Sequence, residues 1–192
     1  TPCTAAYPFF DGFESGGLSC GWQGTSSNSG RISVGAANGP ASGISHMMMD
    51  SALGNSYSLN EAVLTINLTG QSDIQLEFDV KGFSDEFDPL PSSFTGSVNG
   101  DGIALSEDGL NWVALSSLNP SPGYTHVTLD LSSAIAAAGF TSLSSFRIKF
   151  QQYDNYPITS DGMALDNVRL SSFIPSPTPT ASPTLTSTSS PT

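Results

Sequence analysis

The sequence predicts an all-β protein: a two-sheet antiparallel jelly-roll sandwich with one short helix and an extended or disordered C-terminal tail. Short segments of alternating apolar and polar residues follow one another from residue 7 to residue 173, with Gly and Pro between them. Such alternation is the pattern of strands that bury one face. About eight to ten segments at this spacing are typical of a sandwich or jelly roll.

The clearest strand covers residues 74–80, where Ile74, Leu76 and Phe78 share one face. Turn residues at 107–109 separate two apolar segments and predict a hairpin. Trp22 and Trp112 are expected in the core. In chain order, strands are expected at residues 31–34, 46–50, 62–68, 74–80, 103–106, 112–115, 127–131, 146–150 and 163–170.

One helix is expected among the strands. Residues 132–139 begin with Ser, continue with an Ala-rich interior and end at Gly139. These are the cap, interior and stop signals of a helix. We expect a short helix that bridges the two sheets and carries no chemistry of its own.

Composition limits the possible partners. Five Lys and Arg residues face 17 Asp and Glu residues, which gives a formal net charge of −12. Such a surface repels phosphate backbones and anionic membranes. In addition, no segment approaches the roughly 20 apolar residues that cross a bilayer. We therefore expect no nucleic-acid partner and no membrane insertion.

The two cysteines, Cys3 and Cys20, lie near the N-terminus and lack metal-binding spacing. An even count of this kind favours a disulfide in an oxidising compartment, and two free thiols are the alternative. A disulfide would tie the N-terminal segment to the start of the domain.

The composition changes at Ile174, so the sequence predicts a sandwich domain over residues 1–173 and a linker over residues 174–192. From Pro175 to Thr192 only Pro, Ser, Thr, Ala and a single Leu occur. Nothing in this segment can form a core, and Pro favours extended chain. We interpret it as an O-glycosylated linker, with a simple disordered tail as the alternative.

Two acidic segments lie at the ends of the domain. Asp11 and Glu14 accompany the first strand-like residues, and Asp166 lies in the last expected strand. Chain ends often finish close together in a domain, so these carboxylates can converge on one hard cation. Calcium prefers such oxygen ligands. Alternatively, the carboxylates accept hydrogen bonds from backbone N–H groups at turns.

Four segments carry a family resemblance: residues 11–14 (Asp-Gly-Phe-Glu), 18–22 (Leu-Ser-Cys-Gly-Trp), 39–40 (Gly-Pro) and 163–170 (Met-Ala-Leu-Asp-Asn-Val-Arg-Leu). They resemble the MAM domains of adhesion receptors and jelly-roll carbohydrate-binding modules. Asn167 replaces the usual second aspartate, and the further MAM cysteines are absent. The resemblance implies a structural calcium held by Glu14 and Asp166, with Asp11 or Asp50 and main-chain carbonyls completing the shell.

Two loop segments are candidates for ligand binding. Tyr153, Asp154, Asn155 and Tyr156 combine aromatic faces, which stack on sugar rings, with groups that bind hydroxyls. Asp85 and Glu86 belong to an acidic cluster that forms either a ligand rim or a second cation site. The alternatives are tyrosines that pack with only the hydroxyl at the surface and a solvated acidic loop.

The sequence does not support catalysis. It has no Gly-x-Ser-x-Gly elbow, and its two histidines lie far apart. We therefore expect a non-catalytic module, extracellular or on the cell surface, that acts in adhesion or carbohydrate recognition and binds polysaccharide or glycoprotein. The alternative is a structural subunit of a surface layer, stalk or filament, which binds copies of itself through strand edges or its tail.

Overall fold

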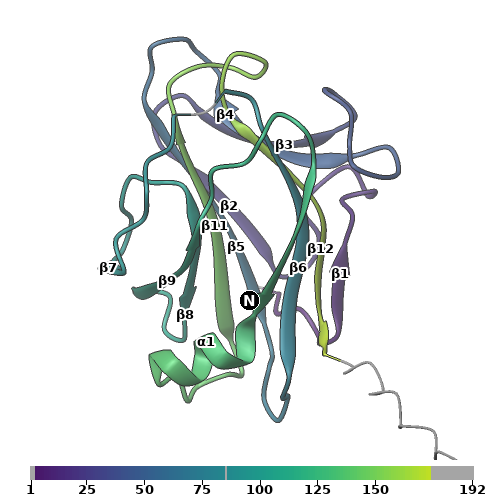
Figure 1. Cartoon of the computed structure of the whole chain (residues 1–192), viewed down its shortest axis with the longest axis vertical. Coiled ribbons are helices and arrows are strands. Elements are labelled where there is room, and N and C mark those ends of the chain that lie inside the picture. The colour runs from purple at the N-terminus through teal and green to yellow at the C-terminus, as the bar shows by residue number, and fades with distance from the viewer. Residues whose placement is uncertain (1–2, 85, 174–192) are drawn as a thin grey trace, which may run out of the picture.

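The computed structural model describes residues 3–84 and 86–173. The predicted linker, residues 174–192, and Asp85 lie outside these ranges. The described chain folds into two six-stranded sheets of antiparallel pairs (Figure 1). This confirms the predicted fold class.

The first sheet contains both ends of the domain. Its strands, in spatial order, are β10 (Thr125–Asp130), β6 (Ile74–Gly82), β12 (Met163–Ser172), β4 (His46–Ser51) and β3 (Gly30–Gly35), with β1 (Phe9–Asp11) also on β12. The first and last strands therefore pair, as the sequence predicted. Along one edge, β12 pairs with β4 through Leu165 and then with β1 from Val168. The change of neighbour coincides with a register shift between Asp166 and Arg169.

The second sheet forms the other layer. Its strands, in spatial order, are β2 (Trp22–Ser26), β5 (Ser58–Ile66), β11 (Phe146–Asp154), β8 (Gly102–Ser106), β9 (Asn111–Ser117) and β7 (Ser93–Thr95). The predicted hairpin is confirmed, because β8 and β9 pair on either side of residues 107–110.

The core lies between the layers and follows the predicted alternation. Phe78 of β6 and Phe150 of β11 are both fully buried and meet edge to face, with 5.4 Å between ring centroids. Trp22 packs against Phe150 at 5.8 Å. Burying a large apolar side chain contributes about 1.5–3 kcal/mol, so contacts of this kind hold the two sheets together.

Helix α1 (Leu131–Ala138) follows β10. Its N-cap is Asp130, whose carboxylate accepts a hydrogen bond from the Ser133 backbone N–H, and Gly139 ends it with a φ of 73°. The predicted Ser cap is therefore wrong, because Asp130 already supplies the acceptor. Ser132 instead accepts a hydrogen bond from Ile74 N through its Oγ. No helix among the described residues is long and apolar enough to cross a membrane.

The predicted disulfide between Cys3 and Cys20 is confirmed, with 5.4 Å between the Cα atoms. It holds the N-terminal segment beside β5. There Ala5 N donates to Thr65 O, and Asn67 N donates to Ala5 O.

Candidate functional site

The outer face of the second sheet carries the polar residues of β11. Phe146, Ile148 and Phe150 point into the core and are fully buried. Because side chains alternate along a strand, Arg147 and Lys149 point to the other side, away from the first sheet. Neighbouring residues of β5 and β2 share this face. A strand that is buried and apolar on one side thus presents charged groups on the other.

A depression of about 230 Å³ lies on this face, and we call it the sheet groove. Its floor comes from β5 and β11, and β2 contributes one side. Loop residues and Trp112 contribute the other side. The sheet groove is lined by Gln23, Thr25, Glu61, Val63, Thr65, Gly96, Ser97, Gly109, Trp112, Arg147 and Lys149.

An ion pair lies at the bottom of the sheet groove. Lys149 Nζ is 2.5 Å from Glu61 Oε1, and their side chains are only 3% and 13% exposed. The same ammonium lies 4.1 Å from the centroid of the Trp112 ring and donates to Gly96 O at 3.1 Å. Glu61 also accepts from the Ser97 hydroxyl at 2.8 Å. These contacts neutralise the buried charges and fix their geometry.

A loop crosses the sheet beside the groove and forms its wall. Gln151 Nε2 donates to Val98 O and to Gly100 O, both at 2.8 Å. Beneath the loop, Trp112 stacks with Phe94 at 6.5 Å in a small second core. Trp112 is therefore buried, as predicted, but on the outer side of the sheet rather than between the sheets.

Arg147 is placed in the groove by the β8–β9 turn. Its Nη1 donates to Glu107 O at 3.4 Å. Gly109 allows this approach, because a Cβ at that position would lie 2.9 Å from the Arg147 guanidinium carbon. Gly109 also has a φ of 79°, a conformation that other residues rarely adopt.

A pair of tyrosines lies at the other end of the same face. Tyr153, near the end of β11, stacks on Tyr57 with 5.5 Å between centroids and 23° between ring planes. Tyr57 is 56% exposed, so one aromatic surface remains open to solvent. Tyr156 is at the surface too, and its hydroxyl donates to Asn55 Oδ1. Of the two predicted tyrosines, Tyr156 is therefore exposed, and Tyr153 is half-buried against the Tyr57 ring.

The other residues predicted to contact sugar differ in placement. Asp154 and Asn155 are 2% and 6% exposed. Burial removes them from the surface on which a sugar would lie, which corrects the prediction for these two residues. The cause is that β11 continues to Asp154, whose side chain turns inward with Phe150. Glu86 is exposed, and Asp85 is not among the described residues.

Glu14 and Asp166, predicted to share a cation, both accept hydrogen bonds from the backbone of one loop. Asp166 Oδ2 accepts from Ala41 N and Ser42 N at 2.9 and 3.1 Å. Glu14 accepts from Ile44 N at 3.0 Å. Burial raises the pKa of Asp166 above its ordinary value. The pattern agrees with the capping alternative, in which carboxylates satisfy backbone donors.

Basic groups hold the other end of this loop. Lys81 donates to the carbonyl oxygens of Asn38 and Gly39. His46 Nε2 lies 2.6 Å from Ala37 O. Burial, together with the nearby charge of Lys81, lowers the pKa of His46. The backbone of residues 37–44 is thus held by side-chain hydrogen bonds along its length.

The two further calcium candidates lie elsewhere. Asp11 accepts from Ser19 Oγ at 2.6 Å and from Trp22 Nε1 at 3.1 Å. Asp50 forms a two-bond pair with Arg31 at 2.8 and 2.5 Å. Within residues 3–84 and 86–173, no group of three or more His, Cys, Asp or Glu side chains is arranged to hold a metal. The four carboxylates do not fit one shared cage, and calcium at Glu14 and Asp166 stays a prediction.

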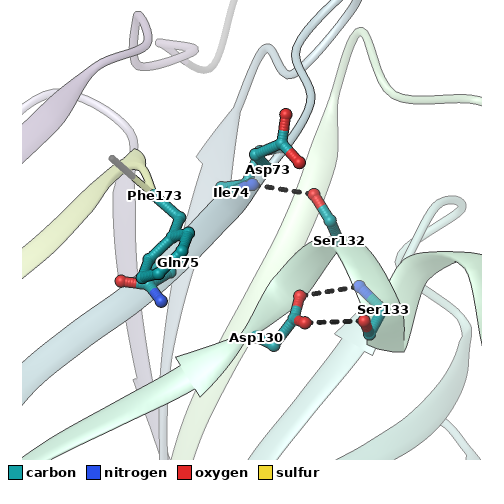
Figure 2. A pocket seen from close by; sticks show the side chains of 7 residues that line it. All are labelled: Asp73, Ile74, Gln75, Asp130, Ser132, Ser133 and Phe173. Carbon is teal, nitrogen blue, oxygen red and sulfur yellow. Dashed lines mark hydrogen bonds between the residues drawn. The ribbon is translucent and has the colours of Figure 1, made fainter. Parts of the chain in front are cut away.

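A second depression, of about 290 Å³, lies beside the start of α1 (Figure 2). Its polar groups already have structural partners, since Asp130 accepts from Ser133 N and Oγ. Figure 2 also shows Ser132 Oγ bound to Ile74 N, with Phe173 at the opposite side. Fewer free polar groups remain here than in the sheet groove, so we regard the sheet groove as the candidate site.

Sequence reasoning missed the sheet groove. Its residues are dispersed over β2, β5, β9 and β11, and none forms a motif. One signal was available: Arg147 and Lys149 alternate with Phe146, Ile148 and Phe150. Two cations on one side of a strand indicate a polar outer face in a chain with only five Lys and Arg residues.

Comparisons with known proteins bear on the fold. No protein-family model matches the sequence, and no curated protein matches it significantly. The CBM22-1–CBM22-2 tandem domain of Paenibacillus barcinonensis Xyn10C aligns over 88% of this chain and 46% of that chain, with 13% identity and a TM-score of 0.50. This chain therefore spans less than half of that two-module protein.

Two further structures align comparably. One, described among carbohydrate-binding modules of the β-sandwich superfamily, has 14% identity, a TM-score of 0.51 and coverage of 87% and 62%. The other, the enzymatically active domain of bacteriophage CBA120 tailspike protein 4, has 12% identity, a TM-score of 0.50 and coverage of 82% and 20%. At these identities the likeness concerns the fold: the chain is a jelly-roll β-sandwich like those of carbohydrate-binding modules.

Proposed function

We propose that this chain is a non-catalytic carbohydrate-binding module and that the sheet groove binds the glycan of a polysaccharide or glycoprotein. The observation that carries the proposal is the sheet groove itself, in which hydrogen-bonding side chains surround a fixed ion pair. The fold likeness to carbohydrate-binding modules supports it. The disulfide supports an extracellular or cell-surface location, because disulfides persist in oxidising compartments.

The chemistry of the groove suits sugar hydroxyls. Gln23 offers an amide donor and acceptor, Thr25 offers a hydroxyl, and Arg147 offers guanidinium donors. Preformed sites with a few well-placed polar groups fix the orientation of a ligand. At the other end of the same face, the exposed ring of Tyr57 provides an apolar surface for the C–H groups of a sugar. The loop that Gln151 binds lies between these two features along β11, so each is a separate contact for a glycan.

The charge of the protein indicates which glycans to test. A formal charge of −12 disfavours acidic polysaccharides. We therefore expect binding to a neutral polysaccharide, such as a mixed-linkage β-glucan, a xylan or a galactomannan, and weaker or no binding to pectin. Affinity gel electrophoresis with each polymer, followed by titration calorimetry on those that retard the protein, provides the measurement.

Substitutions in the groove should weaken that binding. Replacing Gln23 or Thr25 by Ala removes one hydrogen-bonding group, so we expect a loss of roughly threefold to tenfold in affinity per variant. Gln75→Ala, a matched change on the first sheet, should bind like wild type. Tyr57→Ala tests the tyrosine pair separately.

Three results would contradict the proposal. They are no binding to any glycan of a broad array, binding that none of the groove variants changes, and turnover of a polysaccharide by the purified chain. Light scattering on the same samples tests the self-assembly alternative, which predicts particles that grow with protein concentration.

A further inference from the structure

The connection between β5 and β6 contains an Asn-x-Thr sequence. Residues 67–69 read Asn-Leu-Thr, which is the acceptor pattern for N-linked glycans in secreted proteins. No other Asn of the chain fits this pattern, and in Asn119-Pro120-Ser121 the intervening Pro excludes it. Because a three-residue pattern also occurs by chance, its structural setting decides its meaning.

The setting is a surface turn at the end of the sandwich where α1 also lies (Figure 1). Asn67 directly follows β5 and is exposed, as is Thr69. Between them, Leu68 is fully buried in the core, and its N–H donates to Leu143 O at 2.9 Å. This inward anchor leaves the side chains on both sides of it in solvent. A Cβ at Gly70 would meet no heavy atom of a non-adjacent residue within 4 Å, so the space beside the turn is open.

The oxygen and the nitrogen of the Asn67 amide are in different situations. Asn67 Oδ1 accepts a hydrogen bond from the Thr69 backbone N–H at 3.0 Å, which forms an Asx turn. A backbone nitrogen only donates, so the amide atom that faces it is the oxygen. Within the described residues, no hydrogen bond uses Asn67 Nδ2. The turn therefore holds the amide by its oxygen and leaves its nitrogen unengaged on an exposed side chain.

The same turn is tied to the disulfide. Asn67 N donates to Ala5 O at 3.1 Å, and Ala5 lies two residues after Cys3, which is bonded to Cys20. Disulfides form in the oxidising compartments through which secreted proteins pass. Surface loops of secreted proteins are also where the Asn-x-Thr pattern is modified. The disulfide and the exposed turn thus agree with the pattern.

We propose that Asn67 is an N-glycosylation site and that its Nδ2 accepts an oligosaccharide when the chain is exported. The bond that forms joins Nδ2 to the anomeric carbon of the sugar. The bond that breaks joins that carbon to the pyrophosphate of a polyprenyl carrier, which leaves with the electron pair, while Nδ2 loses one proton. The carrier-linked oligosaccharide is the co-reactant, and an oligosaccharyltransferase of the export route is the catalyst.

This covalent sugar is distinct from the other glycans considered above. The sugars predicted on residues 174–192 are O-linked, and the glycan of the sheet groove is bound without a covalent bond. The folded domain can carry a sugar at Asn67, because that side chain makes its described hydrogen bond through its oxygen alone. Attachment therefore leaves the core and the sheet pairing unchanged.

The first test uses the protein purified from its native source. Cleavage after glutamate releases a peptide of residues 62–77, which contains Asn67 and no part of the C-terminal segment. We expect the mass of this peptide to exceed its sequence mass by that of an oligosaccharide. Electron-transfer fragmentation, which keeps the sugar on its residue, should place it on Asn67 rather than on Thr65, Thr69 or Ser72.

Variants secreted by a eukaryotic host test the pattern and the turn separately. Asn67→Asp keeps an oxygen that accepts from Thr69 N but removes the amide nitrogen, so it should fold and lose the sugar entirely. Thr69→Ala keeps the turn, which uses only the backbone of that residue, and should also lose the sugar. Thr69→Ser should retain it. Asn119→Gln is the matched control and should be glycosylated like wild type.

The proposal is overturned if the peptide of residues 62–77 from the native protein has its plain sequence mass, or if the sugar lies on a hydroxyl residue of that peptide. Sugar that persists in Asn67→Asp would overturn it as well. Modification in the eukaryotic host alone would mean that the native export route does not use the site, and that Asn67 serves only to form the turn.

Discussion

Lys149→Met is expected to lower the free energy of unfolding by about 3–5 kcal/mol, the usual loss when one partner of a buried ion pair is removed. Lys149 is 3% exposed and lies 2.5 Å from Glu61. Met fills a similar volume but carries no charge. The Glu61 carboxylate then loses its cation and keeps the hydrogen bond from the Ser97 hydroxyl. The Gly96 carbonyl also loses its donor. Urea unfolding, followed by tryptophan fluorescence, measures the change.

The double variant Lys149→Met, Glu61→Gln provides the control. It removes both charges together, so most of the lost stability should return. If the free energy of unfolding of the single variant falls by less than about 1 kcal/mol, the ion pair behaves like an exposed one. The claim that this pair fixes the floor of the sheet groove would then fail. If the double variant is as unstable as the single one, packing around Trp112 rather than charge explains the loss.

Replacing Cys3 and Cys20 by Ser is expected to lower stability by about 3 kcal/mol, within the range of roughly 2–5 for loss of a native disulfide. The two cysteines are 17 residues apart in sequence. Without the bond, the unfolded chain gains conformational freedom. In the folded state, the backbone pairing of Ala5 with Thr65 and Asn67 must then persist without a covalent restraint.

Reduction of the wild-type protein tests the same bond without a substitution. Thermal scans with and without dithiothreitol should differ by roughly 6–12 °C for wild type, and the double Ser variant should show no difference. A reductant effect that persists in the Ser variant, or equal stability of variant and wild type, would contradict the expected role of the disulfide.

Much of the fold was predictable because one pattern, the two-residue alternation of side chains along a strand, governs most of it. The alternation of Ile74, Leu76 and Phe78 identified β6, since a strand between core and outer surface must follow that pattern. The pairing of β1 with β12 followed from the tendency of chain ends to meet. The helix cap was missed by two residues, because Ser and Asp are both good caps. The tertiary hydrogen bond from Ile74 N to Ser132 Oγ, which engages Ser132 elsewhere, is not visible in the sequence.

The candidate site was less predictable, for a physical reason. Sheet pairing assembles the sheet groove from Gln23, Glu61 and Lys149, which are far apart in sequence, and no local pattern records that pairing. The tyrosine segment was found because aromatic and polar residues cluster there. The length of β11 was underestimated by four residues, however, and that error placed Asp154 on the wrong side of the surface.

The loop held over the second sheet by Gln151 and Lys149 has a consequence for how this scaffold can vary. Three of its contacts with the sheet use main-chain oxygens at Gly96, Val98 and Gly100, so these three do not depend on which side chains the loop carries. Only the bond from the Ser97 hydroxyl to Glu61, among the contacts described above, needs a particular side chain. Loops tolerate insertion and substitution far better than strands do. Changes in this loop can therefore widen or narrow the sheet groove, or add new recognition groups to it. The floor of the groove and the sandwich beneath it stay the same.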